Sequence, residues 1–200
     1  MRALVAGLVI TVAFIVYVYE ETGHSTYPPG VLVPEGPSQV LLAAGPTWQQ
    51  GGFRYTARAE FSMRARVLST ERYWFDGGSA VSPIDFAVGW GRMSDQTVID
   101  QMGYAQTQRW YRYWPKGRQF PLSAQEIAAN SANMHMIPSD KEVNGVLRDV
   151  RRGDLISLSG YLVSVSGENG WKWDTSLSRT DTGNGACELV WVKRLIIHRR

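Results

Sequence analysis

The pattern of apolar and polar positions changes along the chain, and its first segment is the most uniform. Residues 3–19 contain no charged side chain and lie between Arg2 and Glu20. As a helix, these 17 residues would reach ~25 Å, and tyrosines at the interface would help them cross the hydrocarbon core. We therefore expect a transmembrane anchor over residues 1–20.

A cleaved signal peptide also combines a cationic start with a short apolar core. The residues that follow this core, 17–22, are bulky or charged where signal cleavage needs small ones, so the pattern favours an uncleaved anchor. Arg2 before the run and two glutamates after it predict a cytoplasmic N-terminus and an external C-terminal part. The run offers small residues for contact with a second membrane helix: Ala3, Ala6, Gly7 and Thr11.

Residues 21–48 are rich in proline and glycine, which predicts an extended stalk. Within the stalk, residues 40–44 fit a short strand or a helical turn equally well. The remaining residues, 49–200, suit one extracytoplasmic domain with a sizeable core.

The strongest secondary-structure signal is the alternation over residues 53–67. Odd positions are apolar or aromatic, and the even positions between them are polar. This period of two predicts a strand with one buried face. At 3.3 Å per residue the strand would reach ~50 Å, so we expect it to coil around a small barrel or to bend.

Shorter signals complete the expected element order. In the first half they predict one or two short helices within 84–102 and a strand over 106–114. Two helices follow, one after the Ser123 to Glu126 capping box and one over 143–150. The last part is predicted to contain a strand over 155–165 with a phase change at Gly160, a hairpin at 169–170, and a strand over 187–197 that is buried on both faces. The fold class is therefore α+β and β-rich. We expect a small, partly open β-barrel of the oligonucleotide/oligosaccharide-binding (OB-like) type or a sandwich, with short helices inserted.

Composition adds limited constraints. The net charge of +3, from 21 basic and 18 acidic residues, is too small to indicate a nucleic-acid partner. Cys187 is the only cysteine, so no intramolecular disulfide can form. The oxygen-rich segment 173–185 lacks the order of a calcium-binding EF-hand loop, and we expect no metal and no cofactor.

One set of residues resembles the minimum for thiol acyl transfer. His135 is the only histidine inside the expected domain, and it could act as base for a Cys187 nucleophile with Asp85 as orienting group. Asp154 and Asn133 are alternative orienting groups. Because Cys187 begins an apolar strand, a role as a small buried hydrophobe is better supported than catalysis.

Residues 109–118 form a candidate binding segment with four cations, four aromatic residues and no acid: Arg109, Trp110, Tyr111, Arg112, Tyr113, Trp114, Lys116 and Arg118. Outside the cytoplasm such a surface suits anionic headgroups, glycans or an acidic protein partner. An ordinary strand with buried aromatics and solvated arginines explains the same pattern equally well.

Two resemblances bear on these expectations. Met136-Ile137-Pro138 and Arg152-Gly153-Asp154, downstream of an apolar span, resemble two boxes of the membrane-anchored type I signal peptidases. His135 stands where that family has its nucleophilic serine, and no lysine stands in a matching strand. The resemblance therefore implies a β-rich periplasmic domain without peptidase activity.

Segments 83–91, 133–135, 153–154 and 173–183 are similar to landmarks of uncharacterised exported bacterial proteins. That resemblance implies a protein of the bacterial cell envelope. Together with the apolar run and its flanking charges, it predicts a single-pass protein of the inner membrane with a periplasmic C-terminal domain. Taken together, these features predict a non-enzymatic binding or accessory subunit of a cell-envelope complex, with a protein partner. The alternative is an anchored hydrolase or acyl transferase that uses His135 and Cys187.

Overall fold

The computed structural model describes residues 25–178 and 186–198. The predicted membrane anchor and its four helix-contact residues lie outside this part of the chain. Among the described residues, no helix is both long enough and apolar enough to cross a membrane.

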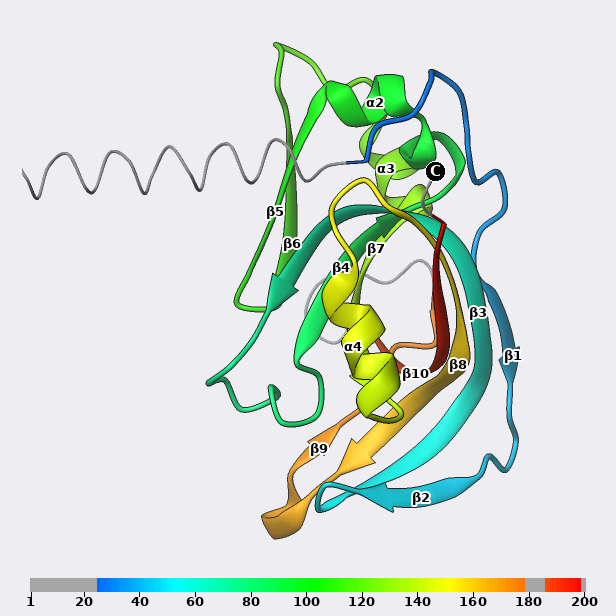
Figure 1. Cartoon of the computed structure of the whole chain (residues 1–200), viewed down its shortest axis with the longest axis vertical. Helices are drawn as coiled ribbons and strands as arrows, with labels where there is room; N and C mark the ends of the chain where they lie inside the picture. The colour runs from blue at the N-terminus through cyan, green and yellow to red at the C-terminus, as the bar shows by residue number, and fades with distance from the viewer. Residues whose placement is uncertain (1–24, 179–185, 199–200) are drawn as a thin grey trace, which may run out of the picture.

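Five strands form a closed ring of pairings, shown in Figure 1. In ring order they are β3 (Phe53–Arg72), β4 (Ile84–Gly89), β7 (Ser131–Pro138), β10 (Glu188–His198) and β8 (Leu155–Ser166), which pairs again with β3. The β7–β10 pair is parallel and the other four pairs are antiparallel. The ring thus brings the two ends of the domain sequence into one mixed sheet.

Strand β3 makes the ring possible because it is long enough to serve two neighbours. Residues 54–66 pair with β8, and residues 66–72 pair with β4. The other edge of its first half carries β1 (Ser38–Leu41) and β2 (Thr47–Gln50). The expected alternation is confirmed, and the strand curves round the ring as its length requires.

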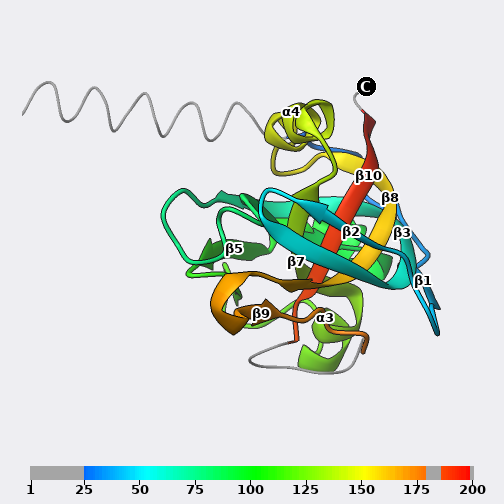
Figure 2. The ribbon, with the colours of Figure 1, turned by 90° about the horizontal axis from the view of Figure 1, so that it is seen from below.

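The interior of the ring is apolar. Side chains from all five strands meet there, with Phe86, Met134, Met136, Ile156 and Leu162 fully buried. Helix α4 (Lys141–Asp149) adds Val143 and Leu147 to the same cluster. Helix α3 (Ala124–Asn130) lies on the opposite side of the strands from α4, as Figure 2 shows.

The outer face of β4, β7 and β10 is also covered. An insertion between β4 and β7 supplies the short helices η1 (Gly91–Ser94) and α2 (Gln96–Asp100), the strands β5 (Met102–Thr107) and β6 (Trp110–Pro115), and α3. These elements form a second apolar cluster with Leu68 and Ala87. The turn η2 (Glu168–Gly170) and β9 (Lys172–Trp173) follow β8 and border a third, aromatic cluster around Trp191.

The fold class expected from the sequence is confirmed at the level of a β-rich domain with few short helices. The capping box of α3, the helix over 141–149 and the hairpin of β8 with β9 are all present, and β10 is buried on both faces over residues 188–192. In the segment 40–44, where strand and helical turn were both open, residues 40–41 end strand β1 and residues 43–44 form a turn.

Three expectations are wrong in detail. Residues 106–114 are not one strand, because Gln108 and Arg109 adopt positive φ angles of 48° and 68° and form the turn between β5 and β6. The short helices expected within 84–102 are present as η1 and α2, but residues 84–89 of that segment form a strand, since β3 and β7 flank them. The bulge expected at Gly160 lies in the partner strand: β10 has a register shift at Val192/Arg194, opposite Gly160 and Ser159, and β3 has further shifts at Ala57/Ala59 and Val67/Ser69.

Residues 25–33, near the start of the predicted stalk, lie against the domain, and we call them the N-terminal strap. Ser94 Oγ accepts hydrogen bonds from the backbone N–H groups of Leu32 and Val33. Tyr27 N–H donates to Gln96, and its hydroxyl donates to the carbonyl of His198. Polar groups of the insertion and of β10 therefore fix this stretch without secondary structure of its own.

Arg66 lies beneath the strap and is fully buried. Its Nη2 donates to the carbonyl of Ser25 and to Gln96, and its guanidinium lies 4.4 Å from the centre of the Tyr27 ring. Burial lowers the pKa of Arg66, an effect that Tyr27, Asp100 and Asp154 oppose. The strap thus covers a buried cation of the ring.

Replacing Gly153 with alanine should loosen the strap. Gly153 has φ +86°, and a Cβ there would meet the carbonyl oxygen of Ser25 at 2.2 Å. We expect faster amide hydrogen exchange at residues 25–33 and a loss of about 1–2 kcal/mol in unfolding free energy. Gly117→Ala is the control, since a Cβ there meets nothing within 4 Å. Equal exchange rates in the two variants would contradict the docked strap.

Candidate functional site

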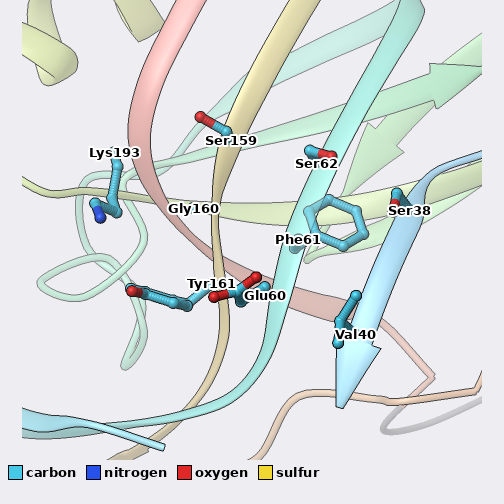
Figure 3. A pocket seen from close by; sticks show the side chains of 9 residues that line it. All are labelled: Ser38, Val40, Glu60, Phe61, Ser62, Ser159, Gly160, Tyr161 and Lys193. Carbon is cyan, nitrogen blue, oxygen red and sulfur yellow. The ribbon is translucent and has the colours of Figure 1, made fainter. Parts of the chain in front are cut away.

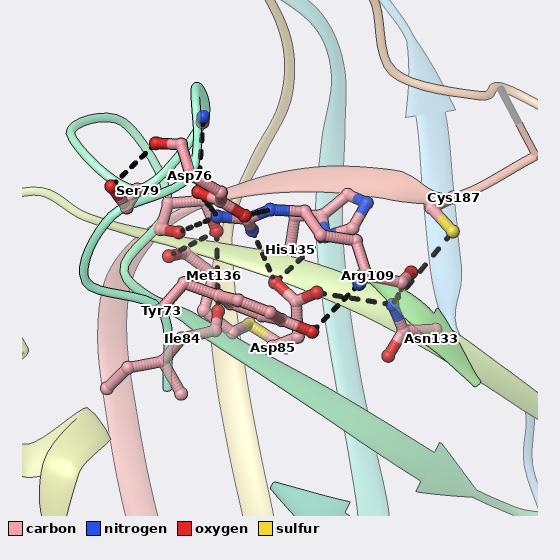
Figure 4. A network of polar contacts seen from close by, with 12 residues as sticks. Tyr73, Asp76, Ser79, Ile84, Asp85, Arg109, Asn133, His135, Met136 and Cys187 are labelled. Atoms are coloured by element: carbon pink, nitrogen blue, oxygen red, sulfur yellow. Dashed lines mark hydrogen bonds and ion pairs between the residues drawn. The ribbon is translucent and has the colours of Figure 1, made fainter. Parts of the chain in front are cut away.

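A network of polar side chains occupies the outer face of β4 and β7, centred on Asp85. This carboxylate has no exposed surface, because β3 and β7 flank its strand and the insertion covers its face. An ionised carboxylate in such a place needs charged partners and hydrogen bonds. Figure 4 shows the side chains that surround it.

Arg109 is the main partner of Asp85. It occupies the β5–β6 turn, where its Nη1 donates to Asp85 Oδ1 at 2.9 Å. The same guanidinium binds Asp76 through Nε at 2.7 Å and Nη2 at 2.9 Å, and Nη2 also donates to the carbonyl of Ser82. The two carboxylates and the Ser82 carbonyl thus accept four hydrogen bonds from the five N–H donors of the guanidinium.

Two aromatic rings frame the Arg109 guanidinium. Its central carbon lies 4.0 Å from the ring centre of Tyr73 and 5.2 Å from that of Trp173. Tyr73 also accepts a hydrogen bond from the backbone N–H of Arg109. Gly78 permits this close packing, since a Cβ there would meet the Trp173 ring at 2.7 Å. The turn of the hairpin is therefore held by charge, by hydrogen bonds and by cation–π contacts.

His135 is the second partner of Asp85. The two residues are paired across β4 and β7, and His135 Nδ1 lies 2.8 Å from Asp85 Oδ1. The two atoms are close, but their geometry does not make a hydrogen bond, so the contact leaves the tautomer of His135 unassigned. Trp173 packs against the imidazole with 4.8 Å between ring centres, and His135 is almost fully buried.

Asn133 links the network to Cys187. Its Nδ2 donates to the carbonyl of Arg109 at 3.2 Å and lies 4.0 Å from Cys187 Sγ. Gln106 donates to Asn133 Oδ1 at 2.6 Å. In the parallel β7–β10 pair, Leu189 stands opposite His135, so Cys187 lies one row away on the same face. The sheet therefore brings the predicted His135, Asp85 and Cys187 into one region.

The electrostatic surroundings follow from this packing. The hydrogen bonds from Arg109 lower the pKa of the Asp76 carboxyl. Burial raises the pKa of the Tyr73 hydroxyl, and it also raises that of Tyr111 on the inner face of the hairpin. Burial and the charge of Arg109 are the physical causes of these shifts.

The predicted binding segment 109–118 divides into two faces. Tyr111 and Tyr113 pack against the second apolar cluster, and Arg109 enters the Asp85 network. The side chains of the opposite face are exposed, with Trp110 and Trp114 each 47% accessible. Arg112 and Lys116 alternate with these indoles on that face, and Arg118 is exposed beyond the strand.

Small residues of β5 stand opposite the large exposed side chains of β6. Gly103 pairs with Trp114, Ala105 with Arg112, and Thr107 with Trp110. The Trp114 ring lies directly over Gly103, where a Cβ would come within 2.3 Å of it. We call Trp110, Arg112, Trp114 and Lys116 the outer hairpin face, since β6 and the residue that follows it present them to solvent.

Sequence patterns located His135, Asp85, Cys187 and the basic-aromatic segment, but not how they are joined. They assigned no role to Asp76, Tyr73, Gln106 and Trp173, whose positions depend on two loops and on the insertion. Among the described residues, no group of three or more metal-binding side chains comes together.

Comparisons with known proteins return no match. No family model, no curated protein and no solved structure is significantly similar to this chain.

Replacing Arg109 with methionine should destabilise the domain more than any exposed substitution on the hairpin. Methionine keeps the volume but leaves the Asp85 carboxylate buried without its main partner, which costs about 3–5 kcal/mol. Arg112→Met, on the exposed face of the same hairpin, should cost less than about 0.5 kcal/mol. Urea unfolding followed by tryptophan fluorescence measures both.

Adding Asp85→Asn to Arg109→Met should recover part of the loss, because the unpaired charge is then removed. A loss for Arg109→Met no larger than that for Arg112→Met would show that the ion pair contributes little to stability.

Proposed function

We propose that this protein is a membrane-anchored, extracytoplasmic binding subunit of a bacterial cell-envelope complex, and that it binds a protein partner through the outer hairpin face. The anchor follows from the apolar run over residues 3–19 and the compartment from the charges that flank it. The observation that carries the binding role is the exposed, alternating arrangement of two indoles and two cations on β6.

We further propose that the ring of five strands is a barrel of the OB-like type. Its support is the strand order β3-β4-β7-β10-β8 with closure by β3–β8, and the single parallel pair β7–β10. Helix α4 stands between β7 and β8 in the chain and packs on the ring core. Proteins of that fold bind ligands on the face of their second and third strands.

In this chain the insertion covers that face. The counterparts of those strands are β4 and β7, whose outer side chains Asp85 and His135 are occupied by Arg109 and Trp173. A ligand would have to displace the hairpin to reach them. The hairpin itself, with its own exposed aromatic face, is thus the better candidate for contact with a partner.

The chemistry of the outer hairpin face suits a protein surface with acidic groups. Tryptophan and arginine are the residues most often found at the energetic centre of protein interfaces. Arg112 and Lys116 lie between and beside the indoles, so an acidic partner would gain charge complementarity together with apolar burial. The short β5 residues opposite them leave the ring faces open to contact.

Substituting Trp110 and Trp114 together with alanine should release the partner. We expect at least about a tenfold loss of the stoichiometric partner that co-purifies with tagged full-length protein in mild detergent. Thermal unfolding should change little, since both indoles are half exposed. Phe75→Ala, a fully exposed residue elsewhere, is the matched control. Recovery of the same partner with the double variant, or of no stoichiometric partner with the wild type, would contradict the proposal.

A second function has one observation in its favour, the 2.8 Å contact between Asp85 and His135 with Cys187 on the same face. In a thiol-based hydrolase or acyl transferase, such a carboxylate orients the histidine that acts as base for the cysteine. Against it, Arg109 also binds the Asp85 oxygen that faces His135, and Trp173 covers the imidazole. Substrate would therefore reach His135 only after the turn of the hairpin had moved.

Alkylation of Cys187 separates the two functions. If the protein only binds, iodoacetamide should modify Cys187 at the rate of an ordinary thiol, and His135→Gln should leave that rate and its pH dependence unchanged. Labelling is followed by mass spectrometry of the full-length protein. A rate at neutral pH that exceeds that of free cysteine and falls at least about tenfold in His135→Gln would favour the enzyme.

A further inference from the structure

A second candidate site lies on the outer surface of β1, β3, β8 and β10, separate from the hairpin. It is a hollow of about 280 Å³ (Figure 3). This volume is at the lower end for small-molecule sites and suits a single ring-sized ligand.

The strand register builds the hollow from small polar residues. Ser38 of β1 pairs with Ser62 of β3, and Ser62 pairs with Ser159 of β8, so three hydroxyls stand in one row across three strands. The next row contains Val40, Glu60 and Tyr161. The short serine side chains between larger neighbours make the depression, as Figure 3 shows.

The bulge in β10 supplies the cation at the edge of the hollow. The register shift between Val192 and Arg194 leaves both Lys193 and Arg194 exposed. Lys193 Nζ lies 5.2 Å from the ring centre of Tyr161, which places the ammonium beside the row of Glu60. The hollow thus has a carboxylate and an ammonium among its lining groups.

Among the described residues, 25–178 and 186–198, neither Glu60 nor Lys193 is paired with an opposite charge. The one contact of the Lys193 ammonium given above is with the Tyr161 ring. The nearest exposed charges on the same face, Arg64 beside Ser62 and Arg194 beyond Lys193, are both basic. The surroundings of the hollow are therefore positive, with one acceptor carboxylate inside it.

We propose that this hollow binds one sugar unit that bears a carboxylate, of the uronic-acid type. The sugar hydroxyls would donate to Glu60 and exchange hydrogen bonds with the serine row, since each serine hydroxyl both donates and accepts. Its carboxylate would bind Lys193 through a charge-assisted hydrogen bond. Tyr161 forms an aromatic wall against which the C–H face of the sugar can pack.

Simpler ligands would contact only some of the polar groups that line the hollow. A small carboxylate such as acetate would satisfy Lys193 and leave Glu60 and the three hydroxyls without ligand partners. A neutral sugar would satisfy Glu60 and the hydroxyls but not the basic surroundings. The combination of a hydroxyl row, one acceptor carboxylate and one cation matches a ligand with both hydroxyls and a negative charge.

Saturation-transfer difference NMR on the full-length protein in mild detergent tests the site. The probes are sodium glucuronate, methyl glucoside and sodium acetate. We expect glucuronate to bind more tightly than methyl glucoside, and acetate not to compete. Glu60→Gln should weaken glucuronate binding by about tenfold, because a hydrogen bond to a charged acceptor becomes a neutral one. Lys193→Gln should reduce glucuronate to the level of methyl glucoside.

The controls separate this site from the hairpin and from loss of fold. Glu142→Gln, on the exposed side of α4, should bind glucuronate as the wild type does, and so should the Trp110 and Trp114 double variant. Circular dichroism confirms the fold of each variant. Saturation transfer absent at about 50 mM glucuronate, equal competition by acetate, or unchanged binding in both Glu60→Gln and Lys193→Gln would overturn the proposal.

Discussion

The buried carboxylate of Asp85 is the constraint on which the arrangement of this domain depends. It stands on an outward-facing position of β4 with no exposed surface, so its charge must be balanced by groups that the ring itself does not contain. Arg109 supplies that balance from the insertion, and the same guanidinium binds Asp76 in the loop before β4. One side chain thus fixes the hairpin and the loop against the ring, and together with the second apolar cluster it gives the 41-residue insertion a defined position.

A second buried cation has a comparable role at the start of the described chain. Arg66 lies inside the ring wall, where its neighbours are a backbone carbonyl, a glutamine side chain and the Tyr27 ring rather than a carboxylate in direct contact. Since burial disfavours its charge, the strap that covers it also supplies its acceptor. Displacing residues 25–33 would remove that acceptor and the cation–π contact together, so the strap and the ring wall stabilise each other.

Local patterns in the sequence predicted the elements that depend on local causes. The alternation of apolar and polar residues over 53–67 predicted β3, the Ser123 capping box predicted α3, and the apolar run at 187–197 predicted β10. Each of these elements is determined by its own side chains. The β5–β6 turn was missed, since Gln108 and Arg109 are unusual residues for positive φ and are held there by Tyr73, Asp76 and Asp85. The Asp85 network could not be assembled from the sequence, because its members come from five segments: residues 73–85, 106–109 and 133–135, Trp173 and Cys187. They meet only through the register of β4, β7 and β10 and the position of the insertion.

The position of Arg109 also explains why the outer hairpin face is free. In an amphipathic two-stranded sheet, one face must be covered, and Tyr111 and Tyr113 with the turn arginine provide that cover. Trp110 and Trp114 then necessarily point away, and their large apolar rings are not needed by the fold. Two half-exposed indoles on a rigidly held hairpin keep an apolar surface in water, which costs free energy unless another molecule covers it. The same charges that fix the hairpin therefore present a preorganised surface, which lowers the entropy that a partner must lose on binding.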